Sequence, residues 1–254
     1  MNHKEVVAQS FGSNAQAYLQ SAVHSAGDDL KRAAQIVSAL PDARAVDLGC
    51  GAGHLTYAVA PFAKSVIAYD LSPEMLSVVH GEAEHRGLKN IQTECGSTED
   101  LPFSDGSVDA VISRYSAHHW RDVRKAMREV SRILRPGGIV CFIDVVGGSE
   151  PLFDTYIQAL ELLRDPSHVR DYTEAEWIAF CSKAGIDAAI DNRWRLPIQF
   201  SAWIERIGTP SSHVAAIRAL WSTAPVEVRE HYGLQADLSF ELDALMLVGT
   251  KRGA

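Results

Sequence analysis

The sequence contains few cysteines, and they follow no pattern typical of a metal site or a disulfide framework. Its 254 residues include four widely spaced cysteines that form no CxxC pair: Cys50, Cys95, Cys141 and Cys181. Structural zinc sites use closely spaced pairs of ligands, and disulfide frameworks are typical of small secreted chains. The cysteine pattern therefore predicts reduced thiols, no metal centre and a cytoplasmic location.

Long apolar runs and an excess of basic residues are also lacking. No stretch approaches the roughly 18 uninterrupted apolar residues that a membrane span needs, and residues 1–25 lack the cationic start and apolar run of a signal peptide. The formal net charge is -8, whereas affinity for phosphate backbones depends on clustered Lys and Arg. These features predict a protein that neither spans a membrane nor binds nucleic acid.

Between residues 43 and 146, short β-rich runs alternate with amphipathic helical runs. The predicted strands are Ala45–Leu48, Ser65–Tyr69, Ile91–Cys95, Val108–Ser113 and Ile139–Val145. The predicted helices are Gly53–Phe62, Pro73–Arg86 and Val123–Leu134. This alternation is typical of an α/β domain with a parallel sheet and helices on both faces.

The flanking segments are less regular, and we interpret them as cover for this core. Residues 1–40 are predicted to form a helical cap with Phe11 and Tyr18 on its apolar face. Residues 150–235 are predicted to supply further helices, one strand and a substrate cover, and residues 238–251 a final strand. The strand is Ala188–Leu196 and the helical runs are Leu152–Leu163, Glu174–Ala184, a stretch near Trp203, and Val214–Trp221. The whole chain is thus interpreted as a single domain.

A glycine-rich turn follows the first predicted strand. The segment Val46-Asp47-Leu48-Gly49-Cys50-Gly51-Ala52-Gly53 runs from that strand into a helix. Glycines allow positive φ angles and let a ligand approach the backbone, although an ordinary tight turn would also use them. His54 stands where a dinucleotide fingerprint has its third glycine, which disfavours pyrophosphate binding.

An acidic residue ends the second predicted strand. Asp70 lies 23 residues after Asp47 and 17 after Gly53. A carboxylate at this position can accept hydrogen bonds from both hydroxyls of a ribose. An Asp here is often a helix cap, but Ser72 can cap the helix that begins at Pro73. The pattern therefore predicts that Asp70 is available to a ribose.

Four segments in order resemble the class I methyltransferase family. They are VDLGCGAGHLT, IAYDLSPEML, GSTEDLPFSDGSVDAVISR and EVSRILRPGGIVCFID, within Ala43 to Asp144. They are most similar to the ubiquinone- and menaquinone-biosynthesis C-methyltransferases and related small-molecule enzymes. The resemblance implies a doubly wound, mostly parallel seven-stranded sheet whose last strand is antiparallel. It also implies S-adenosyl-L-methionine as cofactor and a small-molecule methyl acceptor.

The resemblance also implies roles for individual residues. Asp47 and the turn Gly49-Cys50-Gly51-Ala52-Gly53 would contact the methionine part of the cofactor, and Asp70 its ribose. Leu71 and Met75 would flank the adenine. Its edge would be lined by Ser97, Thr98 and Glu99. The family usually has Asp where Ser97 stands, so a contact there would lack charge assistance.

Two further implied contacts lie outside the glycine-rich turn. Arg114, just beyond the fourth strand, would border the methionine end through its backbone. Phe11, Ala15 and Tyr18 match an N-terminal F-x3-A-x2-Y pattern of this group, in which the helix folds over the cofactor. Periodicity alone is equally consistent with a helix face that packs on the sheet.

Two adjacent histidines are the candidate catalytic residues. His118 and His119 follow the fourth strand in Ser113-Arg114-Tyr115-Ser116-Ala117-His118-His119-Trp120, where an acceptor would meet the methyl group. A neutral imidazole is suited to act as a base. Alternatively, one histidine packs against Trp120 and the other bonds a loop carbonyl. Metal binding is disfavoured because adjacent residues seldom converge on one ion.

Other functions remain open at this stage. A nicotinamide-dependent oxidoreductase would call for GxGxxG, and a nucleic-acid methyltransferase for a basic surface. A cofactor-binding protein without catalysis is compatible with the same motifs. The acceptor, the atom methylated (O, C or N) and the choice between monomer and homodimer are not specified. His24 is a further residue that could face the pocket.

Overall fold

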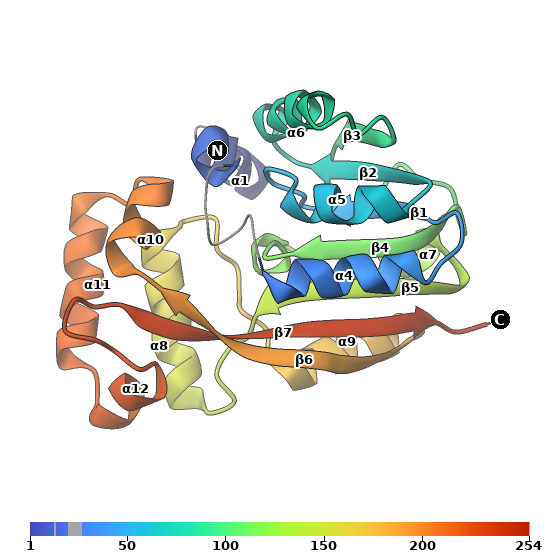
Figure 1. Cartoon of the computed structure of the whole chain (residues 1–254). Helices are drawn as coiled ribbons and strands as arrows, with labels where there is room; N and C mark the ends of the chain where they lie inside the picture. The colour runs from blue at the N-terminus through green and yellow to red at the C-terminus, as the bar shows by residue number, and fades with distance from the viewer. Residues whose placement is uncertain (13, 20–26, 254) are drawn as a thin grey trace.

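A mixed sheet of seven strands organises the chain (Figure 1), and the computed structural model describes residues 1–12, 14–19 and 27–253. The strand order is β3-β2-β1-β4-β5-β7-β6. The strands are β1 (Arg44–Leu48), β2 (Ser65–Asp70), β3 (Ile91–Cys95), β4 (Val108–Arg114), β5 (Leu134–Val145), β6 (Ile186–Ile198) and β7 (Phe240–Lys251). Pairing is parallel from β3 to β5, and β7 is antiparallel to both β5 and β6. The predicted α/β class with an antiparallel last strand is confirmed.

Helices cover both faces of the sheet. The first face packs against α4 (Asp28–Ser38), α5 (His54–Val59) and α6 (Pro73–His85), and the second against α7 (Val123–Ile133) and α9 (Glu174–Lys183). Side chains alternate accordingly: Val66 and Ala68 of β2 face the first group, and Ile67 and Tyr69 face the second. This period of two is expected for a sheet buried on both sides.

A third group of helices extends the core beyond the carboxyl ends of the parallel strands. It consists of α8 (Pro151–Arg164), α10 (Phe200–Ile207), α11 (Ser211–Thr223) and α12 (Val226–His231). These helices share one apolar core with the end of β5, the end of β6 and the start of β7. At the same edge lie the N-terminal helices α1 (His3–Gly12) and α2 (Ala15–Leu19), between this group and α6 (Figure 1). The carboxyl ends of the parallel strands are therefore enclosed by this group of helices on one side and by α1 and α2 on another.

Element boundaries differ from the predictions where proline and sheet pairing intervene. Helix α5 ends at Val59, and a 3-10 turn η1 (Ala60–Phe62) contains Pro61. Strand β5 begins at Leu134 instead of the predicted Ile139, because Leu134 pairs with Val108 before the Pro-Gly-Gly segment. Helix α12 was not predicted.

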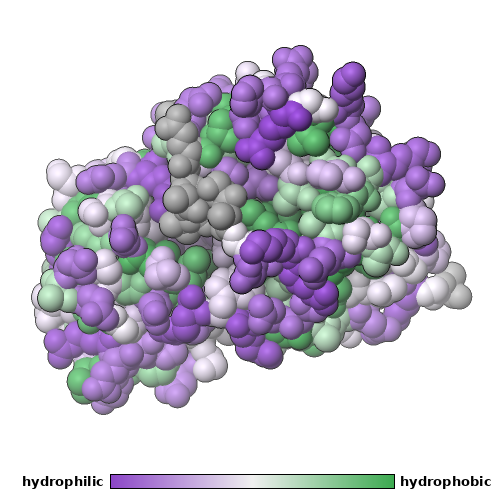
Figure 2. Space-filling view, viewed as in Figure 1, coloured by the Kyte–Doolittle hydropathy of each residue, from purple (hydrophilic) through white to green (hydrophobic). Residues whose placement is uncertain are grey.

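The surface turned to the viewer is mainly hydrophilic, with hydrophobic residues visible in smaller areas between polar ones (Figure 2). In the part of the chain that the structure describes, every helix is too short or too polar to cross a membrane.

Candidate cofactor pocket and active site

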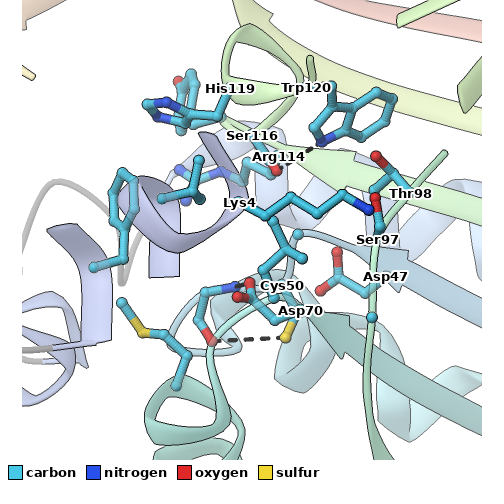
Figure 3. Close-up of a pocket in the computed structure, with 18 of the residues that line it drawn as sticks. Lys4, Asp47, Cys50, Asp70, Ser97, Thr98, Arg114, Ser116, His119 and Trp120 are labelled. Carbon is cyan, nitrogen blue, oxygen red and sulfur yellow. Dashed lines mark hydrogen bonds between the residues drawn. The ribbon is translucent and has the colours of Figure 1, made fainter. Parts of the chain in front are cut away.

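A cavity opens at the carboxyl ends of β1, β2 and β4. Crevices at this edge of a parallel sheet are where ligands bind in doubly wound folds. Every predicted cofactor residue except Gly53 lines it: Tyr18, Asp47, Gly49, Cys50, Gly51, Asp70, Leu71, Met75, Ser97, Thr98, Glu99 and Arg114. Figure 3 shows Asp47, Cys50 and Asp70 on one side of this cavity and His119 and Trp120 on the other. Residues from distant parts of the sequence therefore meet around one space.

The glycines of the turn have distinct reasons to lack a side chain. Gly49 has φ +65°, and a Cβ there would collide with the Ser116 hydroxyl. Gly51 has φ +51°, and a Cβ there would meet no atom within 4 Å. Gly53 has φ +85° and precedes α5, where a Cβ would lie 2.7 Å from the Tyr57 ring. Gly51 thus leaves room beside the cavity, whereas Gly53 serves the start of the helix.

Asp47 is buried at the base of the cavity with only one of its oxygens hydrogen-bonded. The Thr56 hydroxyl donates to Asp47 Oδ2 at 2.6 Å. Oδ1 is buried and has no partner among the described residues. Burial raises the pKa of Asp47 from its ordinary value of 3.8 to about 7. A buried carboxyl with an unsatisfied oxygen is costly, so this position favours a ligand that brings a hydrogen-bond donor or a positive charge.

Asp70 connects the glycine-rich turn to the start of α6. Its carboxylate accepts the backbone N–H of Gly51 and that of Ser72, each at 2.9 Å. Burial raises the pKa of Asp70. Ser72 caps α6 by accepting the Met75 N–H at 3.2 Å, which confirms the predicted cap. Each carboxylate oxygen has a second lone pair, so Asp70 retains acceptor capacity toward the cavity.

The loop after β3 forms the opposite wall. The Ser97 hydroxyl donates to Glu99 at 2.6 Å, and the Asp122 N–H donates to the other Glu99 oxygen at 3.2 Å. Lys4 reaches across the cavity toward Ser97 and Thr98 (Figure 3), and its ammonium lies 4.0 Å from Glu99. Glu99 is therefore held by three neighbours at the rim.

The N-terminal helices close the cavity from above the glycine-rich turn. The Phe11 ring lies 4.9 Å from the His119 ring and 5.4 Å from the Tyr18 ring, measured between centroids. His54 Nε2 lies 3.0 Å from the Tyr18 carbonyl oxygen. Tyr18 therefore lies at the pocket. His24 falls outside the described residues.

Arg114 contributes its side chain as well as its backbone to this region. Its Nε donates to Asp29 of α4 at 2.6 Å, and both side chains are over nine-tenths buried. This ion pair ties the end of β4 to the first helix of the core.

The two predicted catalytic histidines differ in their surroundings. His118 Nδ1 lies 2.6 Å from Asp144. Burial lowers the pKa of His118, but the Asp144 carboxylate outweighs this effect and raises it to about 9. Burial lowers the pKa of His119 well below its usual range, and His118 and His168 add to that effect. The structure thus pairs a charged imidazole with a neutral one, their ring centroids 4.2 Å apart.

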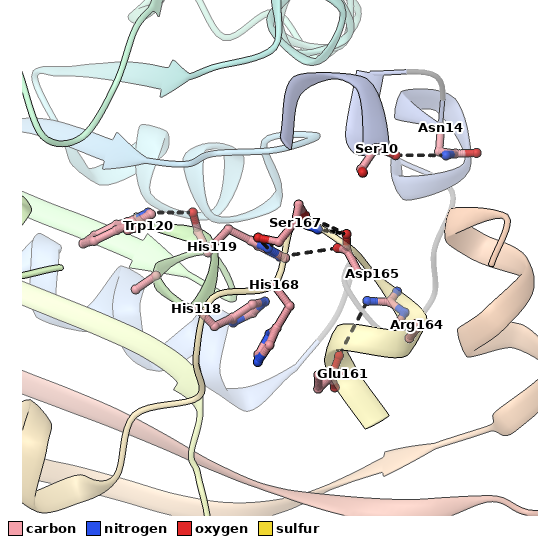
Figure 4. Close-up of polar contacts among 12 residues, drawn as sticks. Ser10, Asn14, His118, His119, Trp120, Glu161, Arg164, Asp165, Ser167 and His168 are labelled. Atoms are coloured by element: carbon pink, nitrogen blue, oxygen red, sulfur yellow. Dashed lines mark hydrogen bonds and ion pairs between the residues drawn. The ribbon is translucent and has the colours of Figure 1, made fainter. Parts of the chain in front are cut away.

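His119 is held by the segment that follows α8. Its Nδ1 lies 3.3 Å from the Ser167 carbonyl oxygen and 3.2 Å from the Ser167 hydroxyl. Ser167 in turn donates to Asp165, and Figure 4 shows this chain of contacts. Of the two contacts considered from sequence, the loop carbonyl is present at His119, while His118 pairs with a carboxylate.

A second cavity adjoins the first. Phe11, Tyr18, Tyr115 and His119 line both cavities. The remaining lining residues come from the turn after β4, from β5, β6 and β7, from α8 and α10, and from the segment after α8: His118, Val145, Leu196, Ile198, Leu242, Glu161, Arg164, Trp203, Arg206 and Asp171. We call this second cavity the acceptor chamber.

Sequence reasoning missed the charged residues of the acceptor chamber. Glu161 and Arg164 are charged side chains, each at least nine-tenths buried, near the end of α8. Their spacing of three residues among the leucines at the end of α8 was the available signal. Asp171 and Arg206 belong to no recognised motif. Among the described residues, no group of three His, Cys, Asp or Glu side chains is arranged to hold a metal ion.

Comparison with known proteins identifies relatives of this fold and site. A family model described as a methyltransferase domain matches residues 46–142. YafE of Escherichia coli (strain K12) is 46% identical over 201 residues, covering 78% of this chain and 96% of YafE. The methyltransferase YcgJ of Bacillus subtilis (strain 168) is 35% identical over 247 residues, covering 95% of this chain and 98% of YcgJ.

Solved structures agree with these matches. The crystal structure of YcgJ has a TM-score of 0.85, covering 89% of this chain and 99% of that chain. A second structure, from Bacillus halodurans C-125, also has a TM-score of 0.85 at 25% identity and covers 89% of this chain and all of its own. Since the relationship to YcgJ spans almost the whole of both proteins, the chain belongs to the methyltransferase family and is an S-adenosylmethionine-dependent enzyme.

Proposed function

We propose that the first cavity binds S-adenosylmethionine and that the acceptor chamber holds a small molecule to be methylated. The observation that carries this proposal is the buried, unpartnered Asp47 Oδ1 beside the open space at Gly51. An amino group from the methionine part of the cofactor would supply the missing donor and a compensating charge. Asp47 Oδ1 would then have the hydrogen-bond partner that it lacks among the described residues.

The rest of the cavity suits a nucleoside. Asp70 has lone pairs left for two ribose hydroxyls, and Leu71 and Met75 provide apolar surface for an adenine. Ser97 donates to Glu99, which leaves its oxygen able to accept a hydrogen bond from an exocyclic amine. These roles follow the expectation from sequence.

When bound, the cofactor would supply an electrophilic methyl carbon attached to a sulfonium sulfur, which is a good leaving group. The protein's main task is to hold the acceptor in line with the carbon–sulfur bond, and such alignment can lower a barrier by about 7–11 kcal/mol. His119 and Tyr18 line both cavities, so we assign them to the place where acceptor and methyl group meet.

The two histidines have different roles toward the acceptor in this proposal. His118 is paired with Asp144 and stays protonated near neutral pH, so it stabilises negative charge on an acceptor instead of taking a proton. His119 is neutral and can accept a hydrogen bond from an acceptor hydroxyl or amine. Its lowered pKa makes it a weak base, which favours a role in orientation.

Calorimetry with S-adenosylhomocysteine and NADH tests the cofactor assignment. We expect micromolar-range affinity for the first, roughly 7–8 kcal/mol, and none for the second. Release of S-adenosylhomocysteine during incubation with S-adenosylmethionine and a panel of phenols, quinone precursors, amines and carboxylic acids tests the transfer. Binding of NADH without S-adenosylhomocysteine would overturn the proposal.

A further inference from the structure

Two arginine side chains line the acceptor chamber, and they are only partly paired with carboxylates. Arg164 of α8 and Arg206 of α10 both line the chamber. Arg206 lies with its Cζ 6.0 Å from the centre of the Tyr18 ring. Among residues 1–12, 14–19 and 27–253, no carboxylate lies within ion-pair distance of Arg206. Arg206 is partly buried, and a partly buried guanidinium without a counter-charge favours an anionic partner.

Arg164 is also incompletely paired. Its side chain is 9% exposed, and its nearest carboxylate, Glu161, lies 4.0 Å away. Its Nε donates to the Trp203 carbonyl at 3.2 Å, and the guanidinium interacts with the Tyr18 hydroxyl. Figure 4 shows Arg164 and Glu161 side by side at the end of α8. Glu161 therefore pairs with Arg164 at the limit of ion-pair distance, and Arg206 has no such partner among the described residues.

Other acidic groups lie near the chamber, but the described residues place none of them within ion-pair distance of Arg206. Asp144 binds His118 and the Ala117 N–H, and Asp165 accepts hydrogen bonds from the backbone N–H and the hydroxyl of Ser167. Burial raises the pKa of both Glu161 and Asp171. Arg206 is therefore the guanidinium at the chamber wall that is available to an anionic ligand.

The walls between these charges are apolar. Trp203 lies beneath Arg164, with 5.3 Å from the guanidinium carbon to the ring centre. Leu196, Ile198 and Leu242 complete this surface.

We propose that the acceptor is a small organic acid, with its carboxylate bound between Arg164 and Arg206 and its aromatic or aliphatic body against Trp203, Leu196 and Ile198. This inference rests on the proposed function, because it takes the adjoining cavity to be the cofactor site. Arginine suits the role since its planar group can bind a carboxylate through two hydrogen bonds. Tyr18, between Arg206 and the cofactor cavity, then separates the carboxylate end from the methyl-transfer position.

The test uses three probes of similar shape on protein saturated with S-adenosylhomocysteine: phenylacetate, phenylacetamide and phenethylamine. Ligand-observed NMR titrations give the affinity of each. We expect phenylacetate to bind roughly tenfold or more tightly than the amide, the range of a charge-assisted contact, and the amine to bind most weakly. Equal or tighter binding of the amide or amine, or no binding of phenylacetate, overturns the inference.

Variants of Arg206 locate the effect. Arg206→Gln should abolish the preference for phenylacetate over the amide, and Arg206→Lys should restore part of it. Arg218→Gln is the matched control, because Arg218 also lies over an aromatic ring, that of Phe200 at 4.8 Å, yet lines neither cavity. A preference that survives Arg206→Gln overturns the inference.

The two proposals fail in different ways. If wild-type protein does not bind S-adenosylhomocysteine by calorimetry, the proposed function itself is wrong. If it binds that ligand with micromolar affinity but shows no preference for the carboxylate, only the identity of the acceptor is wrong.

Discussion

Asp47 has a carboxyl group that the fold buries beside the cavity. This burial raises its pKa to about 7. In the unfolded chain the group ionises near its ordinary value of 3.8, so it destabilises the folded protein increasingly as pH rises between those two values, and by a constant amount above them. A positively charged amino group on Oδ1 would remove that penalty.

Cofactor affinity should therefore rise with pH. Only the ionised carboxylate attracts the amino group, and with a pKa of about 7 affinity for S-adenosylhomocysteine should increase about tenfold from pH 6 to pH 8. Calorimetry across this range measures it. Asp47→Asn is the control, because it keeps the shape and cannot ionise; it should bind more weakly with no pH dependence. A flat wild-type profile would show that Asp47 does not face the amino group.

Asp70 offers a second prediction at the scale of a residue. Asp70→Ala should weaken binding of S-adenosylhomocysteine by roughly 2–3 kcal/mol, because charge-assisted hydrogen bonds to the ribose are lost. It also removes the acceptor for the Gly51 and Ser72 amides, so their hydrogen exchange should accelerate.

Asp70→Asn separates the two effects. Its amide oxygen can still accept a backbone N–H, so local order should be largely retained while the charge is lost. If Asp70→Ala accelerates exchange at Gly51 and Ser72 but leaves affinity unchanged, Asp70 serves the turn alone.

At the scale of elements, α1 packs on the site through partly exposed side chains. None of its residues is buried, and its polar contacts include His3 to the Ser167 carbonyl at 3.0 Å and Lys4 to Glu99 at 4.0 Å. A helix without a buried side chain belongs to the low-stability part of a fold. Its apolar contacts lie over the cavity, so a ligand there would add to them.

We expect α1 and α2 to close over the cofactor as a lid that excludes water. Amides in residues 4–12 and 14–19 should exchange more slowly when S-adenosylhomocysteine is bound. The core helix α4 provides the internal reference, because its exchange should change little. Equal protection of the N-terminal helices in both states, together with slower exchange at Gly51, would show that they are fixed structure.

Tyr18 lies in α2, and its substitution gives a second test of the lid. Tyr18→Phe removes the hydroxyl that interacts with Arg164 and little volume, so it should lower turnover without changing the melting temperature appreciably. Tyr172→Phe is the matched control, because Tyr172 is buried in the core under α9 and lines neither cavity. Full activity in Tyr18→Phe would assign the ring to packing alone.

For the whole molecule, the cofactor should act as a stabiliser of one cooperative unit. At about 100 times its Kd, S-adenosylhomocysteine should add about 2.7 kcal/mol to the free energy of unfolding. For a chain of this size that corresponds to a rise of about 5–10 °C in Tm, measured by differential scanning calorimetry. NADH is the control and should leave Tm unchanged. Two transitions, of which only one responds, would contradict the prediction of a single domain.

The sequence was informative where local signals specify structure. The strands of the core, the Ser72 cap and the position of Asp70 follow from periodicity, capping and turn chemistry. The acceptor chamber was not predictable in the same way. Helix packing beyond the sheet brings together Glu161, Arg164 and Arg206. No short sequence motif predicts which charged side chains such a tertiary contact will bury. The start of β5 was also missed, since its first residue is set by pairing with Val108.

The order β5-β7-β6 has a consequence for how the molecule assembles. Strand β7 follows every other strand in the chain, yet it pairs with both β5 and β6 inside the sheet. Its partner β5 ends at Val145, and β7 begins at Phe240, so their pairing must close a long loop. Closing such a loop costs chain entropy, and this cost slows folding. Until then β5 presents an unpaired edge, the kind of surface that invites mispairing. Leu242 of β7 also lines the acceptor chamber. The acceptor chamber is therefore complete only after β7 has joined the sheet, whereas the parallel strands and the glycine-rich turn use residues that precede it in the chain.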